Sequence, residues 1–198
     1  MTRLGILASH RGSNFQAIID ACERGQLNAS PVLAISNNSQ SMALSRARQA
    51  GIAALHISHV THPDNQDQAI ADALSEHAVD LVITAGFMKK LGPVTLNRFK
   101  GKIINVHPSL LPRHGGAGMY GLNVHQAVID AGDQQTGISI HWVESDYDTG
   151  PVIAQLKIAV AEDDTAASLA EKVIQQEHQL LVSTLASLIS PNPMETSR

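Results

Sequence analysis

Short apolar runs alternate with helical patterns through the first hundred residues, and this alternation constrains the fold more than any other feature of the chain. The apolar runs predict strands at residues 4–8, 32–36, 54–57, 81–84 and 103–106. Helical spacing between them predicts helices at residues 14–23, 42–50 and 67–77. Strands that alternate with helices in this way form βαβ units with parallel strands. Because the runs are almost entirely apolar, we expect helices to cover both faces of the sheet.

The pattern changes after Pro112, where a glycine-rich loop interrupts the alternation. The later elements are expected as a helix at 124–131, two strands at 137–143 and 152–160, and a long helix at 165–189 capped by Thr165. Residues 190–198 are polar and contain prolines, which is typical of a loose tail. A length of 198 residues fits a single domain. We therefore predict one α/β domain: an open, mostly parallel, Rossmann-like sheet with antiparallel additions near the C-terminus.

Composition excludes several classes of partner. The chain has 18 acidic and 14 basic residues, so neither a nucleic-acid groove nor an anionic membrane surface is expected as its partner. No apolar run is long enough to span a bilayer, and the first residues lack the features of a secretory signal. The single cysteine, Cys22, cannot form an internal disulfide, and no spacing of Cys and His predicts a metal site. A cytoplasmic location is expected.

The strand at 103–106 contains Asn105, and His107 follows it directly before the chain turns at Pro108. Residues two apart on a strand face the same side, so the amide and the imidazole are expected side by side. Polar groups on a buried strand are costly without partners, which suggests a use for this pair. The alternative is a histidine at a strand end that is merely capped by a neighbouring carbonyl.

A second candidate is the turn at residues 8–16, which joins the first strand to the first helix and contains Gly12, Ser13 and Asn14. A glycine allows close backbone approach, and the free amides of a helix start attract an anion such as phosphate. The turn matches neither the dinucleotide fingerprint nor the P-loop. The alternative is an ordinary helix capped by serine. In an open parallel sheet, this turn and the Asn105/His107 pair would lie at the same edge.

A third candidate is the acidic turn at residues 144–152, which includes Asp148. Asp and Gly are common in turns for purely local reasons, and that interpretation stays open. If the turn folds over the same edge of the sheet, its carboxylate would raise the pKa of His107 and orient the imidazole.

Other polar residues have simpler interpretations. The histidines at 56, 59, 62, 77 and 114 are scattered and are expected on the surface or in loops. Met88 is expected in the core or a pocket wall, and Lys89 and Lys90 on a solvated face.

The chain resembles the folate-dependent formyltransferases, and among them the enzymes that formylate glycinamide ribonucleotide. The resemblance covers nearly the whole chain and rests on the following segments: Gly12-Ser13-Asn14-Phe15-Gln16-Ala17-Ile18, Ala85-Gly86-Phe87-Met88, Asn105-Val106-His107-Pro108-Ser109-Leu110-Leu111-Pro112, Asp148-Thr149-Gly150-Pro151-Val152 and Gln176-Glu177-His178. It implies transfer of the formyl group of 10-formyltetrahydrofolate to the amine of glycinamide ribonucleotide in purine synthesis, without a metal. It leaves open whether the protein is a monomer or a homodimer.

The resemblance also implies roles for individual residues. Asn105, His107 and Asp148 would form the catalytic group, with His107 protonated and kept charged by Asp148. Gly12, Ser13 and Asn14 would hold the phosphate, and Glu177 the ribose. Folate contacts would come from Met88, Lys89, Lys90, Leu91, Asn105, Glu144 and Asp146. Residues 1–100 would thus form the nucleotide half and residues 101–189 the catalytic and folate half.

Some alternatives remain beside this family assignment. A formyltetrahydrofolate deformylase would use the same Asn, His and Asp with water. Formyltransferases for methionyl-tRNA or sugar nucleotides also share the signature, but neither pairs it with the phosphate turn at Gly12. The chain length argues against the deformylase and the tRNA enzyme, which carry further domains. A protein that only binds a phosphorylated metabolite would not need the catalytic group. The glycine-rich loop at 113–121 is longer than in shorter family members and is either a mobile lid or flexible filler.

Overall fold

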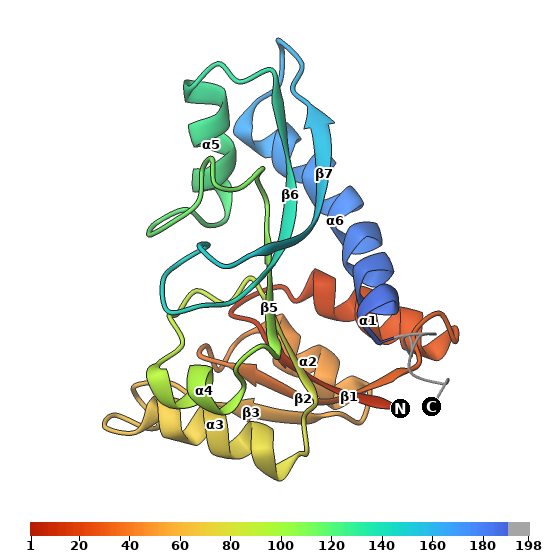
Figure 1. Ribbon diagram of the computed structural model, residues 1–198, viewed down its shortest axis with the longest axis vertical. Helices are drawn as coiled ribbons and strands as arrows, with labels where there is room; N and C mark the ends of the chain where they lie inside the picture. Colours follow the sequence, from red (N-terminus) through yellow and green to blue (C-terminus); the bar gives the residue numbers. More distant parts are fainter. Residues whose placement is uncertain (190–198) are drawn as a thin grey trace, which may run out of the picture.

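Seven strands form one sheet in the part of the chain that the computed structural model describes, residues 1–189 (Figure 1). The strands are β1 (Thr2–Leu7), β2 (Ala29–Ser36), β3 (Ala53–His56), β4 (Leu81–Ala85), β5 (Ile103–His107), β6 (Gln135–Trp142) and β7 (Val152–Ala159). Their order across the sheet is β3-β2-β1-β4-β5-β6-β7. All seven predicted strands are present, with ends shifted by up to three residues.

The sheet is parallel from β3 to β5, and β6 and β7 extend it in the antiparallel direction. The predicted fold class is therefore confirmed. The order of the strands reverses at β1, because the chain builds outward to β3 and then returns to place β4 on the other side of β1. Ligands of open α/β sheets bind beyond the carboxyl ends of the strands at such a reversal. The turn after β1 and the loop after β4 lie at that position.

Helices cover both faces of the sheet, as the apolar strands predicted. They are α1 (Ser13–Glu23), α2 (Met42–Gln49), α3 (Gln66–Glu76), α4 (Pro93–Arg98), α5 (Leu122–Asp130) and α6 (Ala166–Ile189). Thr165 caps α6 as expected, since its Oγ1 accepts a hydrogen bond of 3.2 Å from the amide of Ser168.

The sequence patterns did not predict α4, and a tertiary contact explains why. The helix has six residues, too few for a periodic pattern, and begins with Pro93. Its first amides bind the side chain of Asp67 on α3, with Val94 N to Oδ2 at 2.7 Å and Thr95 N to Oδ1 at 3.1 Å. A carboxylate at a helix start satisfies donors that the helix itself leaves unpaired.

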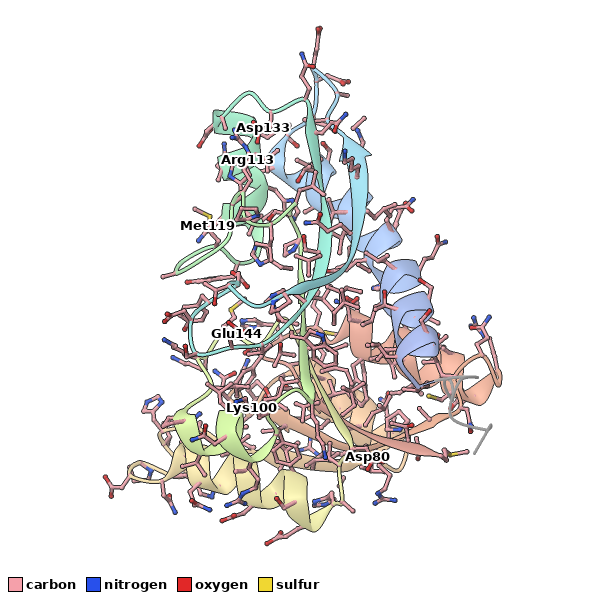
Figure 2. The ribbon with its side chains drawn as sticks, in the orientation of Figure 1. Asp80, Lys100, Arg113, Met119, Asp133 and Glu144 are labelled. Atoms are coloured by element: carbon pink, nitrogen blue, oxygen red, sulfur yellow. The ribbon has the colours of Figure 1, made fainter. Side chains whose placement is uncertain are left out.

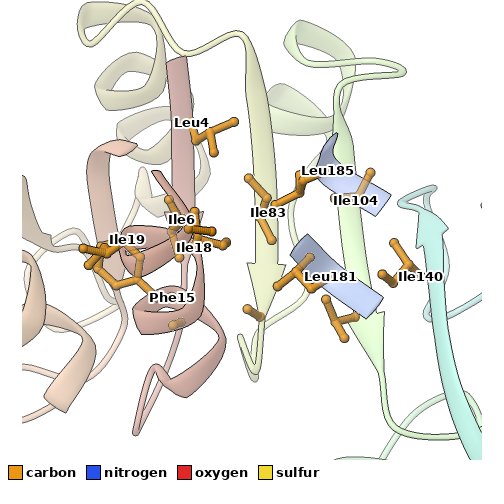
Figure 3. Close-up of a cluster of buried hydrophobic side chains, with 14 of the residues drawn as sticks. Leu4, Ile6, Phe15, Ile18, Ile19, Ile83, Ile104, Ile140, Leu181 and Leu185 are labelled. Atoms are coloured by element: carbon orange, nitrogen blue, oxygen red, sulfur yellow. The ribbon is translucent and has the colours of Figure 1, made fainter. Parts of the chain in front are cut away.

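The core consists of two apolar layers, one on each face of the sheet. On one face, Ile6 and Ile83 of the strands pack against Phe15 of α1 and Leu181 of α6 (Figure 3). The opposite layer contains side chains of β1, β2 and β4 together with α3. These layers fix the strands that carry the candidate site residues.

The predicted tail at 190–198 lies outside the described residues. Within residues 1–189, no helix has both the length and the apolar character needed to cross a bilayer.

Candidate active site

The three segments singled out in the sequence meet around one cavity at the carboxyl end of the parallel strands. The cavity has a volume of about 740 Å³. It is lined by every predicted site residue: Gly12, Ser13, Asn14, Met88, Lys89, Lys90, Leu91, Asn105, His107, Glu144, Asp146, Asp148 and Glu177. The prediction that these three segments lie at one edge of the sheet is thus confirmed.

Asp148 is the point where the polar side chains of β5 come together. Its Oδ2 lies 3.5 Å from Nδ1 of His107, and its Oδ1 lies 3.4 Å from Nδ2 of Asn105. The amide of Gly116 donates to Oδ2 at 2.9 Å. Asp148 has a φ of +57°, a left-handed conformation that Asp tolerates better than most residues. The acidic turn therefore folds over the same edge of the sheet and does more than reverse the chain.

Asn105 is held from both sides by neighbouring strands. Its Oδ1 accepts a hydrogen bond of 2.7 Å from Thr84 of β4, and its Nδ2 lies 3.1 Å from Nε2 of His141 on β6. The antiparallel register places Asn105 opposite His141. His141 donates from Nδ1 to the carbonyl of Trp142 at 2.9 Å, since a carbonyl only accepts. Nε2 of His141 also lies 3.4 Å from Oδ1 of Asp148, so the ring contacts both Asn105 and Asp148.

His107 has a fixed ring orientation. Its Nε2 lies 2.8 Å from the carbonyl of His114, so Nε2 carries a proton and Nδ1 faces Asp148. The histidine is thus capped by a carbonyl, as the simpler interpretation held, and it also faces the carboxylate. Only 4% of His107 is exposed.

Burial and charge act in opposite directions on His107. Burial lowers its pKa and outweighs Asp148 and the His114 carbonyl, which raise it. The resting ring is therefore mainly neutral at pH 7, and the expectation that Asp148 keeps it charged is wrong. Burial also raises the pKa of Asp148, but the hydrogen bond from His141 and the charge of His107 hold that pKa below its usual value. Asp148 is ionised near neutral pH.

The turn after β1 offers uncapped amides to the cavity. Gly12 precedes α1 with a φ of +64°, and no side chain caps the helix start. The serine-capped alternative is therefore wrong. An added Cβ at Gly12 would lie 2.8 Å from Cβ of Ala43 on α2, so this position requires glycine for packing as well as for its backbone conformation.

Asn14 and Glu177 form a buried pair beside this turn. Burial raises the pKa of Glu177 to about 7, although a hydrogen bond from Asn14 opposes the shift. Oδ1 of Asn14 is buried without a hydrogen-bond partner. Buried polar atoms without partners are uncommon and often mark a ligand position.

The loops after β4 and between β6 and β7 both line the cavity and contact each other. Nζ of Lys90 lies 3.1 Å from Oδ1 of Asp146 and 5.7 Å from the centre of the Tyr147 ring. Met88 contacts His10 of the turn after β1, with Sδ 3.2 Å from Nε2. Lys90 is therefore half exposed and also connects the two loops.

Sequence reasoning missed four residues of the site. Thr84, His125 and His141 also line the cavity, and His114 supplies the carbonyl for His107. His114 lies in a loop, as expected, but its side chain is only 13% exposed and contacts Asp133. His125 is 5% exposed, burial lowers its pKa to about 4, and its Nδ1 has no partner among the described residues. His141 could have been found from the antiparallel pairing of β6 with β5, which places it opposite Asn105.

The glycine-rich loop contributes residues 116–121 to the cavity wall. Its beginning is fixed to Asp148 through the Gly116 amide. Among residues 1–189, no group of three or more His, Cys, Asp or Glu side chains is arranged to hold a metal ion.

Comparisons with known proteins give a consistent result. The formyl transferase family matches residues 2–185. The phosphoribosylglycinamide formyltransferase of Haemophilus influenzae is 38% identical over 91% of this chain and 84% of that protein. The Escherichia coli enzyme of the same name is 37% identical over 88% of this chain and 81% of its own length. A crystal structure of phosphoribosylglycinamide formyltransferase from Bacillus halodurans superposes with a TM-score of 0.89 at 34% identity, covering 96% of each chain. The chain therefore belongs to the formyl transferase family, among the phosphoribosylglycinamide formyltransferases.

Proposed function

We propose that this protein transfers the formyl group of 10-formyltetrahydrofolate to the amine of glycinamide ribonucleotide, a step of de novo purine synthesis. The observation that carries the proposal is the single cavity of about 740 Å³. It joins an uncapped helix start, suited to a phosphate, to a His–Asp pair suited to proton transfer. Placing both reactants in one cavity removes much of the entropic cost of their encounter.

The nucleotide would bind at the Gly12 end. The amides at residues 12–14 would hold the phosphate, with Ser13 and Asn14 adding side-chain donors. Glu177 would reach the ribose, and its pKa of about 7 leaves the carboxyl partly protonated at neutral pH. A carboxyl in this state both donates and accepts, as a ribose hydroxyl does.

The folate would occupy the wall formed by the loops after β4 and β6. The volume lies within the range of about 300–1,000 Å³ typical of small-molecule sites. Met88 and Leu91 supply apolar surface, and Lys89, Lys90, Glu144 and Asp146 supply charge. His125 of α5, with its unpartnered Nδ1, is a further polar group of the cavity lining. The residues thus fit a large, partly polar ligand, and the folate supplies the formyl carbon on its N10 nitrogen.

His107 would move the proton between the two nitrogens of the reaction. When the amine nitrogen attacks the formyl carbon, the carbonyl electrons shift to oxygen and the nitrogen becomes positively charged. Nδ1 of the neutral His107 ring takes the proton, and Asp148 stabilises the imidazolium. The imidazolium then gives that proton to N10 as the bond between carbon and N10 breaks. Asn105, whose amide faces the same group, would donate to the oxyanion.

The location and organisation of the chain form part of the same proposal. One sheet runs through both halves, which supports a single formyltransferase domain with a nucleotide half at 1–100 and a catalytic half at 101–189. Cys22 is the one cysteine and is free, which suits a reducing cytoplasm.

The proposal is tested by incubating the purified protein with 10-formyltetrahydrofolate, with and without glycinamide ribonucleotide. Tetrahydrofolate should form only when the amine is present. Equal rates without it would show hydrolysis instead of transfer. The variant His107→Ala should lower kcat by about 10²–10⁴-fold, the usual contribution of a positioned acid or base. His59→Ala, which removes an exposed histidine away from the cavity, is the matched control and should keep full activity.

A further inference from the structure

The carbonyl of His114 determines which nitrogen of His107 is available. Because this carbonyl accepts from Nε2 at 2.8 Å, the proton of the neutral ring stays on Nε2 and the lone pair stays on Nδ1. The backbone at His114 has a φ of +53°, a conformation that a residue with a side chain seldom adopts unless neighbouring contacts hold it. The position of this carbonyl therefore depends on what fixes residues 113 and 114.

Asp133 provides that fixation from a distant part of the chain. Its Oδ2 lies 2.7 Å from Nε2 of His114 and 2.6 Å from Nε of Arg113. Nη2 of Arg113 binds the other carboxylate oxygen, so the guanidinium pairs with Asp133 through two bonds. Figure 2 shows Arg113 and Asp133 close together beside α5. Asp133 is itself held, because its amide donates to the carbonyl of Val128 in α5.

The contact is partly shielded from water. The side chain of Asp133 is 14% exposed and that of His114 is 13% exposed, whereas Arg113 covers them from the outside with 60% exposure. Ser109 adds a hydrogen bond of 2.7 Å to the carbonyl of Arg113. Two successive residues are thus held by side chains that do not line the cavity.

We propose that Asp133 is a positioning residue for the catalytic histidine. By binding Arg113 and His114, it keeps the His114 carbonyl on Nε2 of His107, so that Nδ1 faces Asp148 and the substrates. The inference rests on the proposed function, because it assigns Asp133 a role in that reaction.

The alternative is that Asp133 only stabilises the fold, and the electrostatics of His107 distinguish the two. The titratable groups that influence His107 are Asp148, His141, His114 and, from α5, His125. The His114 carbonyl is one of the groups that raise the pKa of His107. If that carbonyl moves away, the pKa of His107 falls. A neutral base then persists to lower pH, so the acid limb of the kcat profile should shift to lower pH.

The test compares Asp133→Ala with Asp130→Ala. Asp130 lies at the end of α5, is exposed, and binds only Gln126 among the described side chains, so it is a matched control. Asp133→Ala should lower kcat by about 10- to 100-fold, as for a small misplacement of a reacting group, and leave both KM values within about two-fold. The acid limb should move to lower pH. Asp133→Asn, which keeps an oxygen acceptor, should retain part of the lost activity.

Nitrogen NMR of the His107 ring in the substrate-free protein supplies a readout that does not require catalysis. The parent protein and Asp130→Ala should show the Nε2-protonated form, and Asp133→Ala should show a mixture of tautomers. If the ring signals and the pH profile are unchanged while thermal stability falls, Asp133 is purely structural and the inference is overturned. If Asp133→Ala does not fold, Asp133→Asn decides by the same signals. A changed tautomer in a protein without formyl transfer would reject the proposed function but not the positioning.

Discussion

The two ends of the cavity are built differently. At the Asp148 end, the polar side chains already have protein partners: Asn105 binds Thr84, and His107 binds the carbonyl of His114. At the Gly12 end, the start of α1 has no side-chain cap, and Oδ1 of Asn14 is buried without a partner. Asn105, His107 and Asp148 thus have protein partners at one end, and the other end contains groups that a ligand would complete.

The difference suggests how the two tasks of the site are divided. A network that is complete before substrate arrives requires no reorganisation during the reaction, which is the condition for strong electrostatic catalysis. Unpartnered groups cost stability until they are bonded, so their hydrogen bonds appear as binding affinity. Substitutions at the Asp148 end should therefore change mainly kcat, and substitutions at the Gly12 end should change mainly KM or stability.

The largest effect is expected for Asp148→Asn. Asn tolerates the left-handed backbone at this position but carries no charge to stabilise the imidazolium. We expect kcat to fall by about 10²–10⁴-fold with little change in KM. Since Asp148 raises the pKa of His107, the acid limb of the profile should also move to lower pH. Steady-state kinetics from pH 5 to 9 measure both effects. Unchanged kcat would remove Asp148 from the mechanism, and Asp163→Asn, an exposed substitution, is the control.

A smaller effect, on binding, is expected for Ser13→Ala. Loss of one hydrogen bond to a phosphate should raise KM for glycinamide ribonucleotide by about 10-fold, with kcat nearly unchanged at saturation. Ser39→Ala, at an exposed serine outside the cavity, should have no effect. A lower kcat with unaltered KM would contradict the division between the two ends.

Substituting two glycines that have nearly equal φ angles distinguishes the cost of backbone strain from the cost of side-chain packing. Gly12 and Gly25 have φ of +64° and +70°, but an added Cβ at Gly25 would contact nothing within 4 Å. Either substitution to Ala should cost about 1–2 kcal/mol of folding free energy for the left-handed backbone. Gly12→Ala should cost more folding free energy, because its added Cβ would lie too close to Ala43. Only this variant should raise KM for glycinamide ribonucleotide. Denaturant unfolding and kinetics test this, and equal losses at both positions would contradict the packing argument.

A further expected effect is a pH dependence of stability from Glu177. Its folded-state pKa of about 7 lies above its ordinary value of 4.5, so its contribution to stability is present at low pH and is lost as pH rises through about 7. The variant Glu177→Gln has no carboxyl to ionise, so its stability should not fall in this way. Its stability relative to the parent protein should increase by on the order of 2 kcal/mol between pH 5 and pH 8. Denaturant unfolding at both pH values measures the difference, and parallel curves would show that the carboxyl is not buried as described.

Local patterns in the sequence predicted much of this molecule. The alternation of strands and helices predicted the parallel sheet and its covered faces, and the two-residue spacing of Asn105 and His107 predicted their shared side. The strand-end rule predicted that the Gly12 turn would lie at the same edge of the sheet. Each of these inferences depends on neighbours in sequence or on a general property of parallel sheets.

The remaining features depend on contacts between distant segments. His141 enters the site through the antiparallel register of β6 against β5, and α4 depends on a carboxylate from α3. His114 acts through its backbone carbonyl, for which the identity of the side chain gives no signal. The pKa of His107 followed burial instead of the neighbouring Asp148, and burial is a property of the folded core.

The most direct test of the account is a crystal structure of the protein with glycinamide ribonucleotide and a folate analogue that lacks the formyl group. We expect the phosphate on the amides of residues 12–14 and the amine beside Nδ1 of His107, with the folate ring next to Asn105. A nucleotide bound away from the Gly12 turn, or an amine directed away from His107, would contradict the claim that one cavity joins binding and proton transfer.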